Sequence, residues 1–347
     1  MISFRRVLNT FTGTGRPTHA TGGCSPLSMN GQWIGRSGAG KTTLDTALRT
    51  CTIGHPLQSG LLFTTPVDDP VSAIRQLNRT RERVTDLQTR GMTTTLAATP
   101  ETWLLQEGED CRVQITINEC VGQALTNPDG SGAFAEQFRK HQQLLGCSDF
   151  IMVCIRAPQD VTTPDDGAEY DTHVADALLR AALKRHQVSQ QPVVVSILLT
   201  QVDSAFSNPE EARYALNDSA LNHWLRPLIN TIHQSSVVRA AAVIPVSAFG
   251  FQKTADATDV RAAAADADAP VDPRRIPAGV MKSTSLLAKD QKLQPWNLQA
   301  LLPWIVLQTM LSRQVTLKDG QAAVMKRIVI KLRDDLGKLN PWLSVIR

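Results

Sequence analysis

The sequence predicts an α/β fold, with a mostly parallel central sheet and helices on both of its faces. Two continuous apolar runs of strand length, residues 149–158 and 192–200, alternate with segments whose apolar residues recur at helical spacing. Strands that are apolar without interruption are typical of sheets buried on both faces. A glycine-rich loop at residues 35–40 lies between a short strand and a helix and adds a further strand–helix pair.

The predicted elements follow one another in a regular order. Two alternating segments joined by a turn at residues 107–110 are typical of paired strands, and helical patterns separate the remaining strands. The expected strands are residues 32–34, 101–106, 111–119, 149–158, 192–200 and 241–250. The expected helices are residues 41–50, 71–90, 134–146, 171–187, 219–234, 298–311 and 321–339.

Composition divides the chain into three parts. Residues 1–30 are rich in Gly, Thr, Ser and Pro without periodicity, and we expect an irregular tail there. Residues 31–313 are expected to form one domain, with an exposed insert rich in Ala, Asp and Pro near residues 253–296. Residues 314–347 are expected to add a C-terminal helical extension.

Charge and cysteine content exclude several classes of protein. The chain of 347 residues has a net charge of +4 and its basic excess lies before Asp45, so the nearly neutral remainder does not suggest a nucleic-acid-binding surface. Six cysteines without a CxxC pair or a Cys/His cluster argue against zinc and against a disulfide framework. No apolar run reaches the roughly 18 residues of a membrane span. We expect a protein of a reducing, cytoplasmic compartment.

The stretch GRSGAGKTTL, residues 35–44, fits the pattern G-x-x-x-x-G-K-[ST]. In such a loop Gly35 turns the chain out of the strand, while Gly38 and Gly40 let backbone N–H groups approach phosphate oxygens at a helix N-terminus. Lys41 would reach the β- and γ-phosphates, and Thr42 would ligate Mg²⁺. A chance match in a flexible glycine loop is the alternative. The residues assigned to the nucleotide are Gly35, Arg36, Ser37, Gly38, Ala39, Gly40, Lys41, Thr42 and Thr43.

Two polar segments follow predicted strands, at the edge where α/β sheets bind ligands. They read TQVD, residues 200–203, and SAFG, residues 247–250. Together with the glycine loop they resemble the [NT]-K-x-D and S-A-x motifs of the Ras-like and translation-factor-like GTPases, which belong to the P-loop superfamily. The glycine loop, the SAFG segment and residues 295–307 are also similar to bacterial GTPases of conflict or signalling systems.

The resemblance assigns base recognition to Thr200, Gln201, Asp203, Ser247 and Ala248. It implies that the Asp203 carboxylate accepts the N1–H and the exocyclic amine of guanine, and that the Ser247–Ala248 backbone supports the guanine O6. Adenine lacks this pair of donors, so the motif selects GTP. Gln201 departs from the lysine of the family, which implies weaker binding or looser base selectivity. A helix N-cap is the alternative role for Asp203.

The segment NECVGQAL, residues 118–125, follows the predicted strand 111–119. It resembles the D-x-x-G-Q motif of the same family, which implies that Glu119 serves Mg²⁺, Gly122 senses the γ-phosphate and Gln123 orients the attacking water. Glu119 is one methylene longer than the aspartate of the family, and an ordinary turn after a strand is the alternative. The family also needs a threonine that closes on the metal, for which we assign Thr95 among three adjacent threonines.

The resemblance implies a three-layer P-loop NTPase fold and a GTPase domain over residues 31–313. The implied function is a GTP-binding switch that hydrolyses GTP slowly with Mg²⁺ and signals to a protein partner. The long segment between Thr50 and Gly91 would be an enlarged switch region. A structural nucleotide-binding module without turnover and a P-loop ATPase are the alternatives. The basic segment 326–339 leaves contact with an acidic membrane open, although a solvated helix face is the simpler interpretation.

Overall fold

The computed structural model describes most of the chain, in several stretches. They are residues 26–36, 39–66, 100–108, 110–119, 135–158, 166–217, 223–251, 294–313 and 319–347, together with Asn78, Glu82 and Val84. Apart from Asn78, Glu82 and Val84, which are helical, the helix expected over residues 71–90 lies outside the described residues, as does most of the insert expected near residues 253–296.

The described strands form one sheet in the order β2-β3-β4-β1-β5-β6-β7-β8. The five strands from β4 to β7 in this order are mutually parallel, and the strand pairs at the two ends are antiparallel. The mostly parallel sheet is therefore confirmed. The strands are β1 (Leu27–Ile34), β2 (Leu61–Thr64), β3 (Glu101–Glu107), β4 (Asp110–Glu119), β5 (Phe150–Arg156), β6 (Val193–Thr200), β7 (Val238–Pro245) and β8 (Ser344–Val345).

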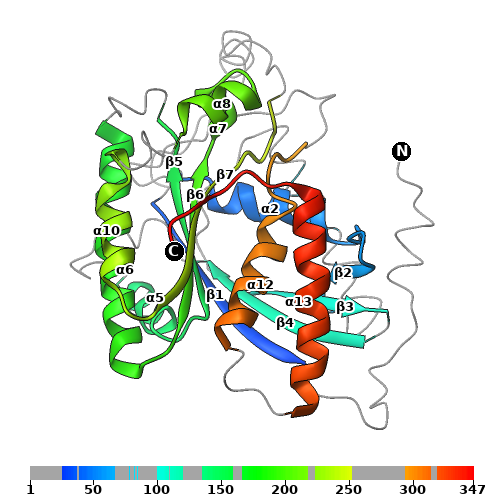
Figure 1. Cartoon of the computed structure of the whole chain (residues 1–347). Coiled ribbons are helices and arrows are strands. Elements are labelled where there is room, and N and C mark those ends of the chain that lie inside the picture. Colours follow the sequence, from blue (N-terminus) through cyan, green and yellow to red (C-terminus); the bar gives the residue numbers. More distant parts are fainter. Residues whose placement is uncertain are drawn as a thin grey trace.

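Helices cover both faces of this sheet, as the sequence predicts. Figure 1 shows α5, α6 and α10 on one side and α2, α12 and α13 on the other. None of the described helices is long and apolar enough to cross a membrane. The helices are α2 (Lys41–Thr52), α5 (Ala135–Leu145), α6 (Asp166–Ser189), α7 (Val202–Ala205), α8 (Pro209–Ala215), α10 (Arg226–Gln234), α12 (Leu301–Arg313) and α13 (Asp319–Leu339).

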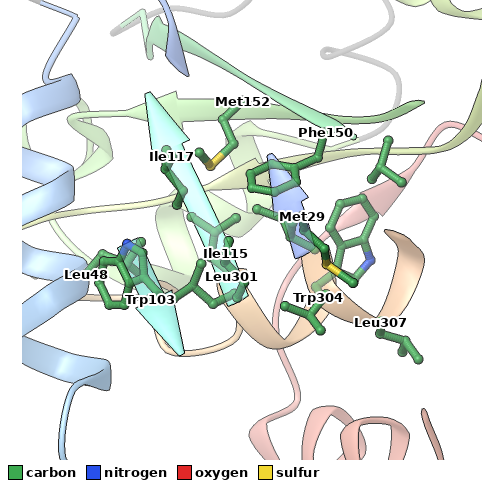
Figure 2. Packing of buried hydrophobic residues seen from close by; sticks show 14 of the residues in the cluster. Met29, Leu48, Trp103, Ile115, Ile117, Phe150, Met152, Leu301, Trp304 and Leu307 are labelled. Atoms are coloured by element: carbon green, nitrogen blue, oxygen red, sulfur yellow. The ribbon is translucent and has the colours of Figure 1, made fainter. Parts of the chain in front are cut away.

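Strand β5 divides the hydrophobic core into two halves because its side chains alternate between the faces of the sheet. Ile151 and Val153 pack in one cluster with residues of α6 and α10, whereas Phe150 and Met152 pack in the other with residues of α2, α12 and α13. The second cluster also holds residues of β1, β3 and β4 (Figure 2). Gly31 permits this packing, because a Cβ at that position would lie 1.9 Å from the Phe150 ring.

The first strand is longer than the sequence predicts. Strand β1 begins at Leu27, so residues 27–30 belong to the sheet, and the irregular tail expected over residues 1–30 is wrong at its end. Leu27 pairs with Val113 of β4, and the backbone N–H of Asn30 donates to Asp149. The polar residues of β1 interrupt its apolar pattern, so the sequence does not predict a strand there. The pairing that defines the strand involves residues that are distant in sequence.

The C-terminal segment is part of the domain rather than an extension of it, which corrects the boundary expected at residue 314. Helix α13 packs on α12 and places Met325, Ile328, Val329 and Leu332 in the second core cluster. Strand β8 then pairs with β7 and joins the sheet. The alternation of apolar and charged residues in α13 reflects one buried face and one exposed face.

Candidate nucleotide-binding site

The candidate site lies at one edge of the sheet. Strands β1, β4, β6 and β7 are parallel, so their carboxyl ends meet at this edge. The glycine loop follows β1, and Glu119 is the last residue of β4. The TQVD segment ends β6 and begins α7, and the SAFG segment follows β7. The topology therefore brings together the motifs that the sequence places far apart.

Lys41 is buried at the start of α2, beneath the glycine loop. Its Nζ donates to the carbonyl oxygen of Gly35 at 2.6 Å and to that of Arg36 at 3.0 Å. An ammonium group has three N–H donors, so this arrangement still allows a bond to a phosphate oxygen. Gly40 precedes the helix with φ +82°, a left-handed conformation that favours glycine. These contacts fix the lysine against the loop before any anion binds.

The N-terminus of α2 is suited to an anion. No side chain caps it among the described residues, and its first turn carries no acidic residue. The first backbone N–H groups of an α-helix have no partner within the helix, and together with the helix dipole they favour negative charge at this position. Thr43 lies in the same first turn. Ser37 and Gly38 of the loop lie outside the described residues.

Thr42 and Glu119 are placed together, as expected for a metal site. The Thr42 hydroxyl donates to Glu119 Oε1 at 2.7 Å, because β1 and β4 are neighbours and Trp33 pairs with Glu119. A hydroxyl that donates its proton to a carboxylate can still offer an oxygen lone pair to a cation. Hydroxyl and carboxylate oxygens are ligands that Mg²⁺ prefers. The pair therefore fits Mg²⁺, although the described residues contain no group of three or more His, Cys, Asp and Glu side chains suited to a metal.

The TQVD segment lies against the glycine loop. The Thr200 hydroxyl donates to the carbonyl oxygen of Ala39 at 2.9 Å, with Ile155 O at 3.3 Å. A Cβ built at Gly40 would lie 3.8 Å from the Thr200 side chain and 3.8 Å from Gln201 Nε2. Gln201 adopts a left-handed conformation with φ +59°. The turn at the end of β6 therefore holds the last part of the glycine loop.

Asp203 faces the SAFG segment. The Ser247 hydroxyl oxygen accepts from the backbone N–H of Phe249 at 3.1 Å and from that of Gly250 at 2.8 Å. The Ser247 hydroxyl lies close to the Asp203 carboxylate, because the two segments follow the paired strands β6 and β7 and Val246 N donates to Leu199 O at 2.8 Å. Ala248 is buried beside this network.

Burial raises the pKa of Asp203, while the hydrogen bonds from Ser247 and from the backbone oppose that rise. The helix N-cap interpretation of Asp203 is wrong. The residue at the N-cap of α7 is Gln201, and Asp203 is the second residue of the helix. The side chain of Asp203 is therefore available for a role other than capping.

Arg36 of the glycine loop contacts α6. Its Nε lies 2.6 Å from the buried Asp171 carboxylate, and its guanidinium lies 5.3 Å from the centre of the Tyr170 ring. An ion pair and a cation–π contact of this kind hold the side chain on the α6 side of the loop. The backbone of Arg36 serves the site through its carbonyl oxygen, which accepts from Lys41.

His141 is a neighbour of the site that the sequence does not predict. It is buried on α5, and its Nε2 has no hydrogen-bond partner among the described residues. Burial, and then the charge of Lys41, lower the pKa of His141 to about 3. A single histidine on a helix gives no sequence signal for this position.

Three of the assigned residues with roles in hydrolysis lie outside the described residues. They are Thr95, Gly122 and Gln123. Their roles stay predictions.

The chain has an α/β fold with a mostly parallel sheet, in which the glycine loop lies between β1 and α2. No family model and none of the curated proteins matches the sequence. The chain is similar to the GTPase-like domain of Ski7 from S. cerevisiae bound to GTP, at 13% identity over 64% of this chain and 43% of that one, with a TM-score of 0.37.

The chain is also similar to translation elongation factor SelB from Methanococcus maripaludis in complex with the GTP analogue GppNHp. The identity is 12%, over 65% of this chain and 31% of that one, with a TM-score of 0.32. The chain thus spans less than half of the length of each of these two structures. At this level of similarity, the two structures assign no residue of the candidate site. The description of the site rests on the contacts within this chain.

Proposed function

We propose that the protein binds GTP with Mg²⁺ and hydrolyses it slowly, as a switch that signals to a protein partner. One observation carries the proposal: the TQVD and SAFG segments lie together at the sheet edge that holds the glycine loop, where Thr200 donates to Ala39 O at 2.9 Å and Val246 N donates to Leu199 O at 2.8 Å. This arrangement places the Asp203 carboxylate beside Ser247, and a carboxylate has several acceptor positions for a ligand.

The chemistry of guanine fits this carboxylate. Guanine presents its N1–H and its exocyclic amine side by side, and one carboxylate accepts both. Adenine presents an acceptor at N1, so it would leave a buried acceptor of Asp203 facing another acceptor. The backbone N–H of Ala248 would donate to the guanine O6. Thr200 links this base site to the glycine loop through Ala39.

The phosphates would lie over the glycine loop. Lys41 and the N-terminus of α2 supply positive charge there, and Thr42 with Glu119 would hold Mg²⁺. The bound metal would neutralise charge on the β- and γ-phosphate oxygens. Lys41 is already held by two backbone carbonyls, so little side-chain entropy is lost when it binds phosphate.

Slow turnover follows from the position of Arg36. It is the arginine of the glycine loop, and its guanidinium is paired with Asp171 of α6. An arginine supplied by a partner raises the rate of GTP hydrolysis by about 10³–10⁵ in enzymes of this kind. With Arg36 engaged by α6 and Gln123 orienting the water, we propose that the protein alone turns over slowly and that a partner accelerates it.

The test is the Asp203→Asn variant. It replaces one acceptor oxygen with an amide donor, which then faces a donor of guanine, at a cost of about 1–3 kcal/mol. Xanthine has a carbonyl where guanine has its amine, so the variant should shift preference from GTP toward XTP. Competition binding with GTP, XTP and ATP on both proteins measures the shift.

Two results would overturn the proposal. One is an original protein that prefers ATP, and the other is an Asp203→Asn variant that keeps its affinity for GTP. Asp334→Asn is the matched control, because Asp334 lies on the exposed face of α13 and pairs with Lys338. The control variant should bind the three nucleotides as the original protein does.

A further inference from the structure

The SAFG segment after β7 is held by residues that directly precede α12. Ser247 and Trp296 exchange two backbone hydrogen bonds, with Ser247 N donating to Trp296 O at 3.2 Å and Trp296 N donating to Ser247 O at 3.0 Å. Gly250 has φ +76°, and a Cβ there would lie 2.2 Å from the carbonyl oxygen of Gln294. The SAFG segment is therefore fixed from a segment about 50 residues further along the chain.

Asn297 connects this region to the C-terminal segment. Its Nδ2 donates to the carbonyl oxygen of Pro245 at 2.8 Å and to that of Trp342 at 2.6 Å. Its Oδ1 accepts from Trp342 N at 3.1 Å. An asparagine amide has two N–H donors, so both are used. One side chain thus ties the end of β7, two residues before Ser247, to the residues that lead into β8.

Three aromatic side chains reinforce the same connection. Phe251 and Trp296 pack edge to face with ring centres 5.1 Å apart, and the centres of Trp296 and Trp342 are 6.2 Å apart. All three are half-buried. The packing joins Phe251, which follows the SAFG segment, to Trp296 and Trp342. The Asn297 side chain links the same regions of the chain from the other end of the segment.

We propose that Asn297 is a positioning residue for base recognition: by tying Pro245 to Trp342, it holds the SAFG segment in place beside the TQVD segment. This inference rests on the proposed function and names a residue outside the motifs that recognise the base. Within the described part of the chain, the Asn297 side chain bonds to Pro245 and Trp342, on the base side of the site. Loss of its bonds should weaken binding of the guanine base and leave binding of the phosphates unchanged.

The Asn297→Gly variant tests the proposal. Asn297 has φ +60°, a left-handed conformation that glycine adopts readily, so the variant removes the three side-chain bonds without adding backbone strain. Affinity is measured for GTP and for tripolyphosphate, each with Mg²⁺, by competition against a fluorescent GTP analogue. We expect GTP affinity to fall about tenfold and tripolyphosphate affinity to stay within about twofold.

The Asn297→Asp variant sharpens the test. It keeps an oxygen that accepts from Trp342 N, but its carboxylate has no donor for the two carbonyl oxygens and would repel them. We expect a larger loss of GTP affinity than in Asn297→Gly. Asn340→Gly is the matched control, because Asn340 is exposed, has φ +43° and lies at the end of α13. It should leave both affinities unchanged.

The outcomes separate this inference from the proposed function. If the original protein binds GTP no better than tripolyphosphate, base recognition itself fails. If the original protein prefers GTP and Asn297→Gly keeps that preference, the positioning role is wrong and the proposed function stands. An equal loss of both affinities would mean a general structural role and would also overturn the inference.

Hydrogen exchange on the original protein gives a measurement that does not depend on the folding of a variant. Coupling between two regions is reciprocal, so GTP should slow exchange in residues 294–298 and 341–346 as well as in residues 245–251. Protection limited to residues 245–251 would contradict the proposal.

Discussion

His141 shows how burial beside the glycine loop changes the chemistry of a single residue. Burial, followed by the charge of Lys41, lowers its pKa from 6.5 to about 3 in the folded protein. In the unfolded chain the imidazole recovers its ordinary pKa. Between these two values the unfolded state binds a proton that the folded state does not, so acid favours unfolding.

The His141→Gln variant should therefore be less sensitive to acid than the original protein. Between pH 7.5 and pH 5, the original protein should lose about 2 kcal/mol of unfolding free energy through His141, and the variant should lose that much less. Urea unfolding at both pH values measures the difference. His173→Gln, which changes an exposed histidine of α6, is the control. An unchanged pH dependence in His141→Gln would contradict the assigned burial.

Sequence patterns predict residues whose chemistry is tied to a fixed local spacing. Lys41 and Thr42 belong to a contiguous loop pattern; the structure places Lys41 against the loop and Thr42 beside Glu119, while their roles toward phosphate and Mg²⁺ stay predictions. Asp203 and Ser247 come from short motifs, which lie side by side because they follow the paired strands β6 and β7; their role in base recognition stays a prediction. Asn297 was not predicted, because its role depends on partners 52 and 45 residues away.

At the scale of elements, α13 shows how a charged residue anchors a helix. Asp335 is buried on the otherwise apolar inner face of α13. Its carboxylate accepts from the backbone N–H of Ser59 at 2.9 Å and from the Ser59 hydroxyl, in the loop between α2 and β2. Hydrogen bonds to a buried charged group are worth more than neutral ones, at about 1.5–3 kcal/mol each. Helix α13 is thus tied to the far end of the sheet.

The Asp335→Ala variant should lose about 2–4 kcal/mol of unfolding free energy, because it leaves the Ser59 donors without their acceptor. Asp334→Ala is the matched control on the next residue. Asp334 is exposed and pairs with Lys338 four residues later, so its removal should cost less than about 0.5 kcal/mol. Urea unfolding compares the two variants. Equal losses would show that the Ser59 contact does not anchor α13.

Elements with a strong period were predicted, and short or polar ones were not. The buried strands β5 and β6 and the helices α6 and α12 lie where the pattern places them. Strands β2 and β8 have four and two residues, which is too short for a period to show. The proline of α10 was expected inside a longer helix, but that helix begins at Arg226 with the proline in its first turn.

At the scale of the whole molecule, the parallel sheet explains why distant motifs form one site. Parallel strands direct their carboxyl ends to one edge of the sheet. The fold class therefore already predicts that the glycine loop, Glu119, the TQVD segment and the SAFG segment meet there. The boundary of the domain was not predictable in the same way. From the sequence alone, the C-terminal residues are interpreted as a separate helical extension. Their docking depends on α12, β7 and Ser59 rather than on a local sequence pattern.

Base selectivity tests the central claim most directly. We would measure equilibrium binding of GTP, GDP and ATP to the original full-length chain with Mg²⁺, under one set of conditions. The account predicts that GTP and GDP bind at least about tenfold more tightly than ATP, because only guanine offers the pair of donors that the Asp203 carboxylate would accept. Binding of ATP with equal or higher affinity would contradict it.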